Sequence, residues 1–201
     1  MTILDEFRDE ARRRGALGAG AALDVRTAFR IVRDMPWGFA SADGADLRPE
    51  TTIEAWRGTG REKHLLLGAI LAALGYEVGL LAVTHEFSPE STPWLPPHLL
   101  QETRGAPIPD VHVLLRVQTN QVTDEWATID ASWPLSTRDL GLPVNEQLVT
   151  GVDQRIACDP IEMFHLASNH DHGEDNPGDD GPGPGADPGE DEDDDEDETP
   201  T

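Results

Sequence analysis

The chain has 201 residues and is strongly acidic, with 39 Asp and Glu against 15 Lys and Arg and a formal net charge of −24 at pH 7. This charge argues against nucleic acid and anionic membrane surfaces as partners, because both bind clusters of basic side chains. No stretch reaches the roughly 18 apolar residues of a membrane span, and the first residues lack the apolar core of a secretory signal. The sequence therefore predicts a soluble, cytoplasmic protein.

The acidic residues are concentrated at the C-terminal end. Residues 169–201 contain 15 Asp and Glu but no Lys, Arg, Val, Ile, Leu, Met or aromatic residue. Such a segment cannot bury enough apolar surface to offset the entropy of ordering it. We therefore expect one folded domain over residues 1–168 and a disordered acidic tail over residues 169–201.

Apolar residues at helical spacing predict two helices near the N-terminus. Leu4, Phe7 and Ala11 lie on the first and Phe29 and Val32 on the second, and a glycine-rich run separates the two. Residues 39–55 are expected to form a loop, with a short helical turn around residues 53–56.

The clearest element is a helix over residues 61–74. It is apolar on nearly all sides, which is typical of a buried central helix. Thr59 and Glu62 have the spacing of a capping box, and Gly75 is a natural stop. Gly60 is thereby placed in the first turn, with its backbone at the positive end of the helix dipole.

Strands are predicted over residues 77–83, 111–117 and 125–130. A proline-rich loop joins the first two, and a turn at 118–122 joins the second to the third. The last two strands would pair in antiparallel fashion, with His112 on one and Asp130 at the end of the other. Residues 131–168 are expected to be mostly irregular. The predicted fold class is α+β, with the central helix packed on an antiparallel sheet.

A helix start followed by strands that carry His and Asp is typical of enzymes with an activated thiol. Residues 58–67 read G-T-G-R-E-K-H-L-L-L. They resemble the motif G-T-C-x-x-K-H-x-L-L of bacterial proteins in the transglutaminase-like superfamily, which has a papain-like core. Residues 108–112 resemble the family pattern I-P-(D/E)-x-H, and residues 126–132 resemble W-x-x-x-D-x-(T/S). The resemblance covers about residues 50–165 and differs at the cysteine, where this chain has Gly60.

The resemblance implies that Gly60 occupies the position of the nucleophile and that His112 and Asp130 occupy those of its catalytic partners. In active relatives the cysteine attacks an amide carbonyl, and the acyl group then passes to an amine or to water. Glycine offers no side chain for this step, so ordinary thiol acyl transfer is not expected. No cofactor is implied.

Three functions remain open at this stage. The first is a non-catalytic peptide-binding or protein-binding or scaffolding module, with the ligand between the start of the central helix and His112. The second is an amide hydrolase or acyl transferase that uses a substitute nucleophile, or a water activated by His112 and Asp130. In the third, the body is a structural unit of a larger assembly and the tail is the working part. His112 and Asp130 would also suit a purely structural pair.

Further candidates for the site are Cys158, Thr59 and the basic residues that follow Gly60. Cys158 lies in a segment without helix-start signals, and the Thr59 hydroxyl is better explained as a helix cap, so neither is expected to replace the nucleophile. Arg61, Lys63 and His64 suit contact with an anion, but exposure of Arg61 and local ion pairing of Lys63 explain them equally well.

Two groups of residues are expected to be structural or solvated. The patch of His165, His170 and His172 is not expected to bind a metal, because ordering a polar segment around the ion is unfavourable. The tryptophans Trp94, Trp126 and Trp133 are expected to serve packing.

Overall fold

The computed structural model describes residues 1–88, 90–92, 98, 106–120 and 122–166. The chain divides into two units, residues 1–169 and 170–201, and the described residues all belong to the first. The predicted acidic tail, Trp94, His170 and His172 lie outside the described residues. Within the described part, no helix combines the length and the apolar character needed to cross a bilayer.

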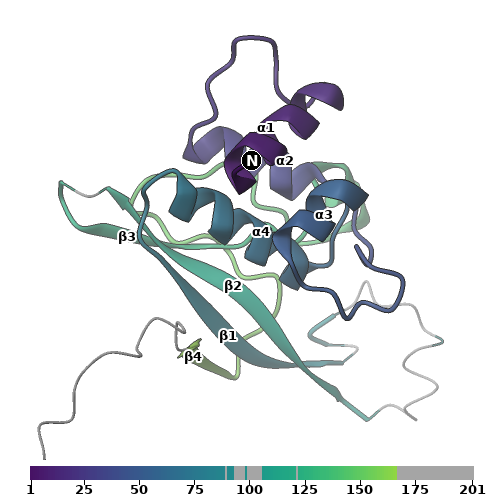
Figure 1. Cartoon of the computed structure of the whole chain (residues 1–201). Helices are drawn as coiled ribbons and strands as arrows, with labels where there is room; N and C mark the ends of the chain where they lie inside the picture. Colours follow the sequence, from purple (N-terminus) through teal and green to yellow (C-terminus); the bar gives the residue numbers. More distant parts are fainter. Residues whose placement is uncertain (89, 93–97, 99–105, 121, 167–201) are drawn as a thin grey trace, which may run out of the picture. The chain divides into compact units, whose positions relative to one another are not determined.

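The fold is α+β, as predicted (Figure 1). The described residues form one four-stranded sheet in which all strand pairs are antiparallel and the strand order is β3-β2-β1-β4. The elements in chain order are α1 (Ile3–Arg13), α2 (Val25–Asp34), α3 (Pro49–Ala55), α4 (Gly60–Ala73), β1 (Val78–Phe87), β2 (Ile108–Asn120), β3 (Glu125–Ile129), the 3-10 helix η1 (Leu135–Leu140) and β4 (Glu162–Leu166).

Helix α4 lies at the centre of the first unit. It contacts α1, α2 and α3 and the strands β1 and β2. Its fully buried residues, among them Leu66 and Ile70, share one core cluster with Leu115 and Val117 of β2 and Ile129 of β3. Figure 1 shows the helices gathered on this face of the sheet. The predicted capping box is present, with Thr59 at the N-cap.

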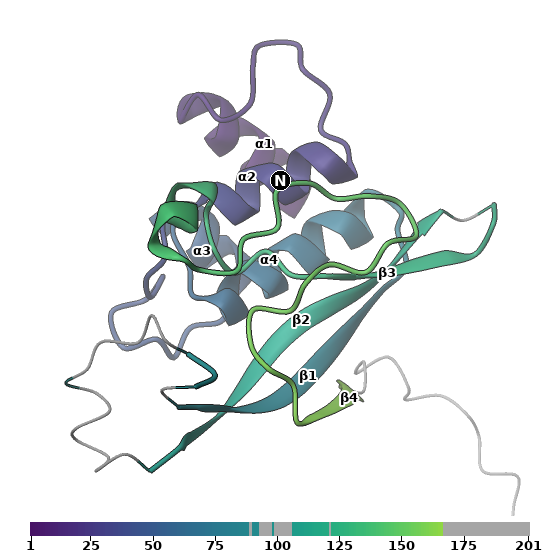
Figure 2. The ribbon, with the colours of Figure 1, turned by 180° about the vertical axis from the view of Figure 1, so that it is seen from behind.

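The other face of the sheet is covered by an irregular segment. Leu81, Val83 and Leu114 point to this side and are packed against Ile156 and Cys158. In Figure 2 the chain between η1 and β4 runs across this face before it joins the sheet edge. The buried layer on this side is thus smaller than the one under the helices.

The structure differs from the prediction at five elements. Residues 39–55 are not all loop, since α3 begins at Pro49, a residue favoured in the first turn of a helix. Strand β1 continues to Phe87, and β2 extends through part of the predicted turn to Asn120. The segment 131–168 contains η1 and β4, and β4 was missed because its residues are all exposed and show no alternation.

Candidate functional site

Gly60 and His112 lie side by side. A Cβ atom at position 60 would be 3.5 Å from Cε1 of His112 and 3.0 Å from Oγ of Ser132. Gly60 is the first residue of α4 and does not have a positive φ, so the backbone itself does not demand glycine. A side chain here would displace the Ser132 hydroxyl by only a few tenths of an ångström. The structure therefore places the predicted nucleophile position directly against the imidazole.

His112 is held by Asp130, as the two sequence motifs predicted. Its Nε2 lies 2.9 Å from Oδ2 of Asp130. Asp130 immediately follows β3, which pairs with β2, so the sheet brings the two residues together. The side chain of His112 is 13% exposed and that of Asp130 only 1%. With Nε2 engaged, Nδ1 is the nitrogen that can exchange a proton with a ligand.

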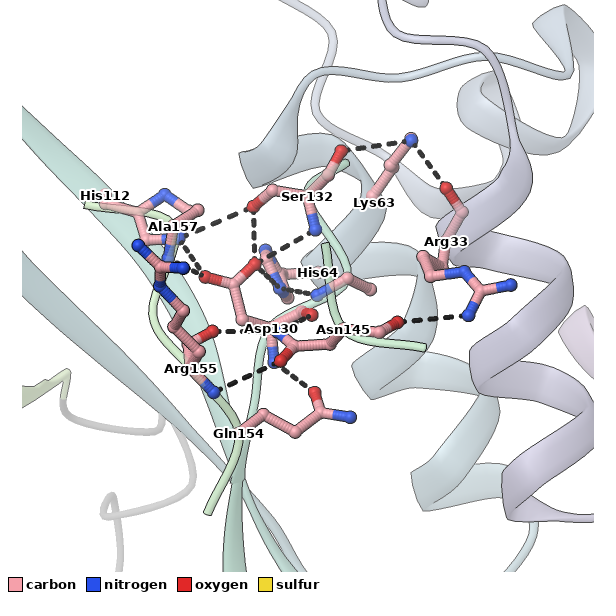
Figure 3. A network of polar contacts seen from close by, with 11 residues as sticks. Arg33, Lys63, His64, His112, Asp130, Ser132, Asn145, Gln154, Arg155 and Ala157 are labelled. Carbon is pink, nitrogen blue, oxygen red and sulfur yellow. Dashed lines mark hydrogen bonds and ion pairs between the residues drawn. The ribbon is translucent and has the colours of Figure 1, made fainter. Parts of the chain in front are cut away.

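The carboxylate of Asp130 is surrounded by hydrogen-bond donors (Figure 3). Besides His112, Oδ2 accepts from the amide of Ala157 at 2.7 Å, and Oδ1 accepts from the amide and the hydroxyl of Ser132 at 3.0 and 2.7 Å. Burial alone would raise the pKa of Asp130. This effect of burial is outweighed by the hydrogen bond from His112, by the charge interaction with the imidazoles of His112 and His64, and by the hydrogen bond from Ser132. Together they hold the pKa of Asp130 below its usual range. Asp130 is thus an anion in the folded protein.

The polypeptide backbone around Asp130 is fixed as well. Its amide donates to Oε1 of Gln154 at 2.8 Å, and its carbonyl accepts from Nδ2 of Asn145 at 3.0 Å. Both partners belong to the irregular segment that crosses the sheet. This segment therefore has a positioning role that the sequence patterns did not indicate.

His64 is a buried structural residue, and its predicted contact with an anion is wrong. Its Nε2 accepts a 2.8 Å hydrogen bond from the amide of Ala131, so the ring proton is on Nδ1. Burial lowers the pKa of His64 to about 4, against the opposing effect of Asp130. The ring meets that of His112 edge-on, at 5.7 Å between centroids. His64 consequently supports the site from inside as a neutral group.

Lys63 is neither an anion ligand nor part of a local ion pair, so both expectations for it are wrong. Its side chain is fully buried, and Nζ donates to the carbonyls of Arg33 and Ser132 at 3.0 and 3.2 Å. Burial lowers the pKa of Lys63 to about 7. Lys63 thus connects α4 to α2 and to the loop after β3. Arg61, by contrast, is exposed, as one of the two alternatives expected.

Neither Cys158 nor Thr59 is suited to act as a nucleophile at the site. Cys158 is packed against the smaller core, and burial together with the nearby carboxylates raises the pKa of its thiol to about 12. It is therefore protonated at neutral pH, whereas the thiolate is the reactive form. The Thr59 hydroxyl accepts from the amide of Glu62 as the helix cap.

The structure also describes His165, Trp126 and Trp133. His165 is on the exposed strand β4. Trp126 donates through Nε1 to Asp124 in the β2–β3 hairpin, and Trp133 stacks on Trp37. Among the described residues, no group of three or more His, Cys, Asp or Glu side chains is arranged to hold a metal ion.

Sequence reasoning missed His85, which borders the site from β1. It is only 4% exposed, its Nε2 is 3.5 Å from Oδ2 of Asp110, and its ring lies edge-on to His112 at 6.4 Å between centroids. Position 85 continues the alternation of Leu81 and Val83. A longer predicted strand would therefore have placed it on the face that carries His112.

Comparisons with protein-family models, with curated proteins and with solved structures gave no match for this chain. The function is therefore argued from the geometry of the site.

Proposed function

We propose that this chain is a transglutaminase-like protein whose nucleophile position is vacant, and that it binds a peptide or protein side chain at this position without acyl transfer. One observation carries the proposal: a Cβ at position 60 would lie 3.5 Å from the imidazole of His112. A sulfur on that Cβ would be close to a histidine whose orientation Asp130 fixes. This is the arrangement that activates a thiol.

The lack of acyl transfer follows from the groups around Gly60. Glycine has no side chain, Cys158 has a raised thiol pKa, and Thr59 caps α4. The hydroxyl of Ser132 is buried and donates to Asp130. It is therefore bonded to the carboxylate that would have to help activate it. A ligand carbonyl or amide could instead exchange hydrogen bonds with His112 Nδ1 beside the open position.

A second candidate is an amide hydrolase in which His112 and Asp130 activate a water. The observation that favours it is the intact 2.9 Å contact between the two side chains, because a carboxylate that orients a histidine makes it a usable general base. Hydrolysis of a glutamine-containing peptide by the purified chain, abolished by His112→Ala, would replace the binding proposal with this one.

The proposal is tested by restoring the thiol. In a Cys158→Ala background, Gly60→Cys should have a thiol pKa at least about one unit below the ~8.5 of a free cysteine. The rate of alkylation by iodoacetamide as a function of pH measures this value. Adding His112→Ala should return the pKa towards ~8.5, because the imidazolium that stabilises the thiolate is removed.

Arg61→Cys is the matched control. It adds a thiol one residue further along the same helix turn, at an exposed position. This thiol shares the helix dipole with position 60 but not the contact with His112. Gly60→Ala controls for the displacement of Ser132, and its thermal unfolding should remain cooperative. Equal thiol pKa values in Gly60→Cys and Arg61→Cys would contradict the proposal.

A further inference from the structure

Three aromatic side chains form a cluster beside the site, two of them exposed and the third, Trp133, half-buried. Trp37 is 52% exposed and Phe39 is 58% exposed. The Trp37 ring stacks on that of Trp133 at 6.1 Å between centroids and meets that of Phe39 at 6.4 Å. Large apolar side chains exposed together often mark a binding surface, and aromatic residues dominate the energetics of many interfaces. We call Trp37, Phe39 and Trp133 the aromatic rim.

Hydrogen bonds fasten the rim to the start of α4. The amide of Gly38 donates to the carbonyl of Gly58 at 3.4 Å, and the amide of Gly58 donates to the carbonyl of Pro36 at 3.1 Å. The amide of Ala40 donates to Oε1 of Glu62 at 3.0 Å. Trp133 directly follows Ser132, the residue closest to the Cβ position of Gly60. The rim is thus attached to both segments that enclose the vacant position.

One cation, Arg57, lies against the rim segment, and a second, Arg61, directly follows Gly60. Arg57 and Arg61 are exposed, and neither forms an ion pair with a described residue. The side-chain Cδ of Arg57 lies 3.7 Å from the Cβ position of Gly38, between Trp37 and Phe39 in the chain. An apolar surface therefore adjoins unneutralised positive charge, although the chain as a whole is acidic.

We propose that the aromatic rim binds a peptide segment that carries a large apolar side chain next to one or two carboxylates. The apolar side chain packs on Trp37 and Phe39, and the carboxylates interact with Arg57 and Arg61. This inference rests on the proposed function, because it names the class of peptide that the vacant site would receive.

The chemistry of the rim argues against two other occupants. The chain's own residues 169–201 contain no aromatic residue and no Val, Ile, Leu or Met, so they lack the apolar side chain that the rim needs. A long polynucleotide would meet the net charge of −24, which repels a polyanion far more than it repels a short peptide. The partner is therefore a segment of another protein.

The test uses the full chain and a fluorescein-labelled peptide in which phenylalanine and glutamine are flanked by two aspartates. Fluorescence anisotropy measures its affinity. Trp37→Ala and Phe39→Ala should each weaken binding by about tenfold or more, as expected for exposed aromatic residues at the centre of an interface. The double variant Arg57→Gln, Arg61→Gln should weaken it several-fold, with a smaller loss at high salt.

Matched controls distinguish binding at the rim from nonspecific binding to other exposed side chains. Ile161→Ala removes another exposed apolar side chain, and Arg30→Gln another exposed cation, and both should bind as the unaltered chain does. A peptide with serine in place of phenylalanine should bind at least about tenfold more weakly. The inference is overturned by absence of binding at about 1 mM, a weak interaction by any measure, by equal binding of the serine peptide, or by tighter binding of oligothymidylate.

The two proposals fail separately. If Trp37→Ala leaves peptide affinity unchanged while Gly60→Cys still shows a lowered thiol pKa, the binding role of the rim is wrong, and the proposal of a vacant nucleophile position is kept. If the rim variants lose binding while the thiol pKa values of Gly60→Cys and Arg61→Cys are equal, the chain has a peptide-binding surface, but its site is not related to the transglutaminase-like thiol site.

Discussion

At the scale of single residues, the buried amine of Lys63 joins helix α2 and the loop after β3 to the helix that carries Gly60. Its two acceptors are backbone carbonyls, so the amine forms no salt bridge that would favour its charged form. Burial therefore determines its protonation and lowers the pKa to about 7. In the unfolded chain the same group titrates near 10.5. Between these values the unfolded chain binds one proton more than the folded one.

Stability should consequently rise with pH over this window, by at most about 1.4 kcal/mol per pH unit. Lys63→Met should remove this rise and leave the two carbonyls unpaired, at a loss of about 1–3 kcal/mol. Urea unfolding between pH 7 and 10 measures both effects. Both proteins should carry Cys158→Ala, because the raised pKa of that thiol acts in the opposite direction.

The difference in pH dependence between the Lys63→Met variant and its parent can be assigned to one amine, because Lys63 is the sole lysine of the sequence. An equal pH dependence in the Lys63→Met variant would show that the amine is charged in the folded state.

The roles of Lys63 and His64 illustrate what residue patterns cannot predict. The Thr59–Glu62 cap is local, and its three-residue spacing predicted the start of α4 correctly. The partners of Lys63 and His64 in the loop after β3 lie 69 and 67 residues away in the chain. No spacing rule connects such positions, so two basic residues beside a helix start suggested an anion contact or, for Lys63, a local ion pair, when both are in fact buried.

At the scale of elements, the N-terminus of α4 does more than begin a helix. Glu62 is buried, and its two oxygens accept from the amides of Thr59 and Ala40. The first bond completes the capping box, and the second holds the segment that carries the aromatic rim. Helix α1 has a capping box of the same type, in which Asp5 takes the place of Glu62 on an exposed surface.

This repetition offers a matched pair of substitutions. Glu62→Ala should reduce the free energy of unfolding by about 2–3 kcal/mol, because two partly buried amides lose their acceptor. Asp5→Ala should reduce it clearly less, since Asp5 is exposed and water can replace the lost acceptor. Chemical denaturation measures both. Hydrogen exchange of the Ala40 amide should accelerate in Glu62→Ala alone, and equal losses in the two variants would contradict this account.

The elements that the sequence predicted are those with a strong periodic signal. Helix α4 and the β2–β3 pair were placed correctly, because an all-round apolar run and a regular alternation depend on nearby residues only. Strand β4 was missed, since its exposed residues pair with β1 through the backbone. Helix α3 was largely missed as well, because its seven residues bury only Thr52 and Ile53.

At the scale of the whole molecule, one buried carboxylate joins the separate parts of the fold. Asp130 follows β3, bonds to His112 of β2, and lies 3.6 Å from the Nε2 of His64 in α4. The amide of Ala157 attaches the segment that crosses the far face of the sheet. Helices, sheet and irregular segment are therefore all sensitive to the charge at this point.

This arrangement predicts a stepwise loss of stability in acid. The folded-state pKa of His64 is about 4, against about 6.5 in the unfolded chain, so the unfolded chain binds the extra proton between these values. The free energy of unfolding should therefore fall as the pH decreases from about 6.5 to 4. Below the ordinary pKa of 3.8, the stabilising contribution of ionised Asp130 should then be lost as well.

Urea denaturation at pH 7, 5.5 and 4.5 resolves the first step. His64→Gln retains an acceptor for the Ala131 amide but cannot take up a proton, so its stability should fall less than that of the unaltered chain over this range. His165→Gln changes an exposed position on β4, and the stability of this variant should fall as much as that of the unaltered chain. If the free energies of unfolding of His64→Gln and the unaltered chain fall in parallel with pH, His64 is protonated in the folded protein. The acceptor role that the 2.8 Å contact with Ala131 assigns to its Nε2 would then be wrong.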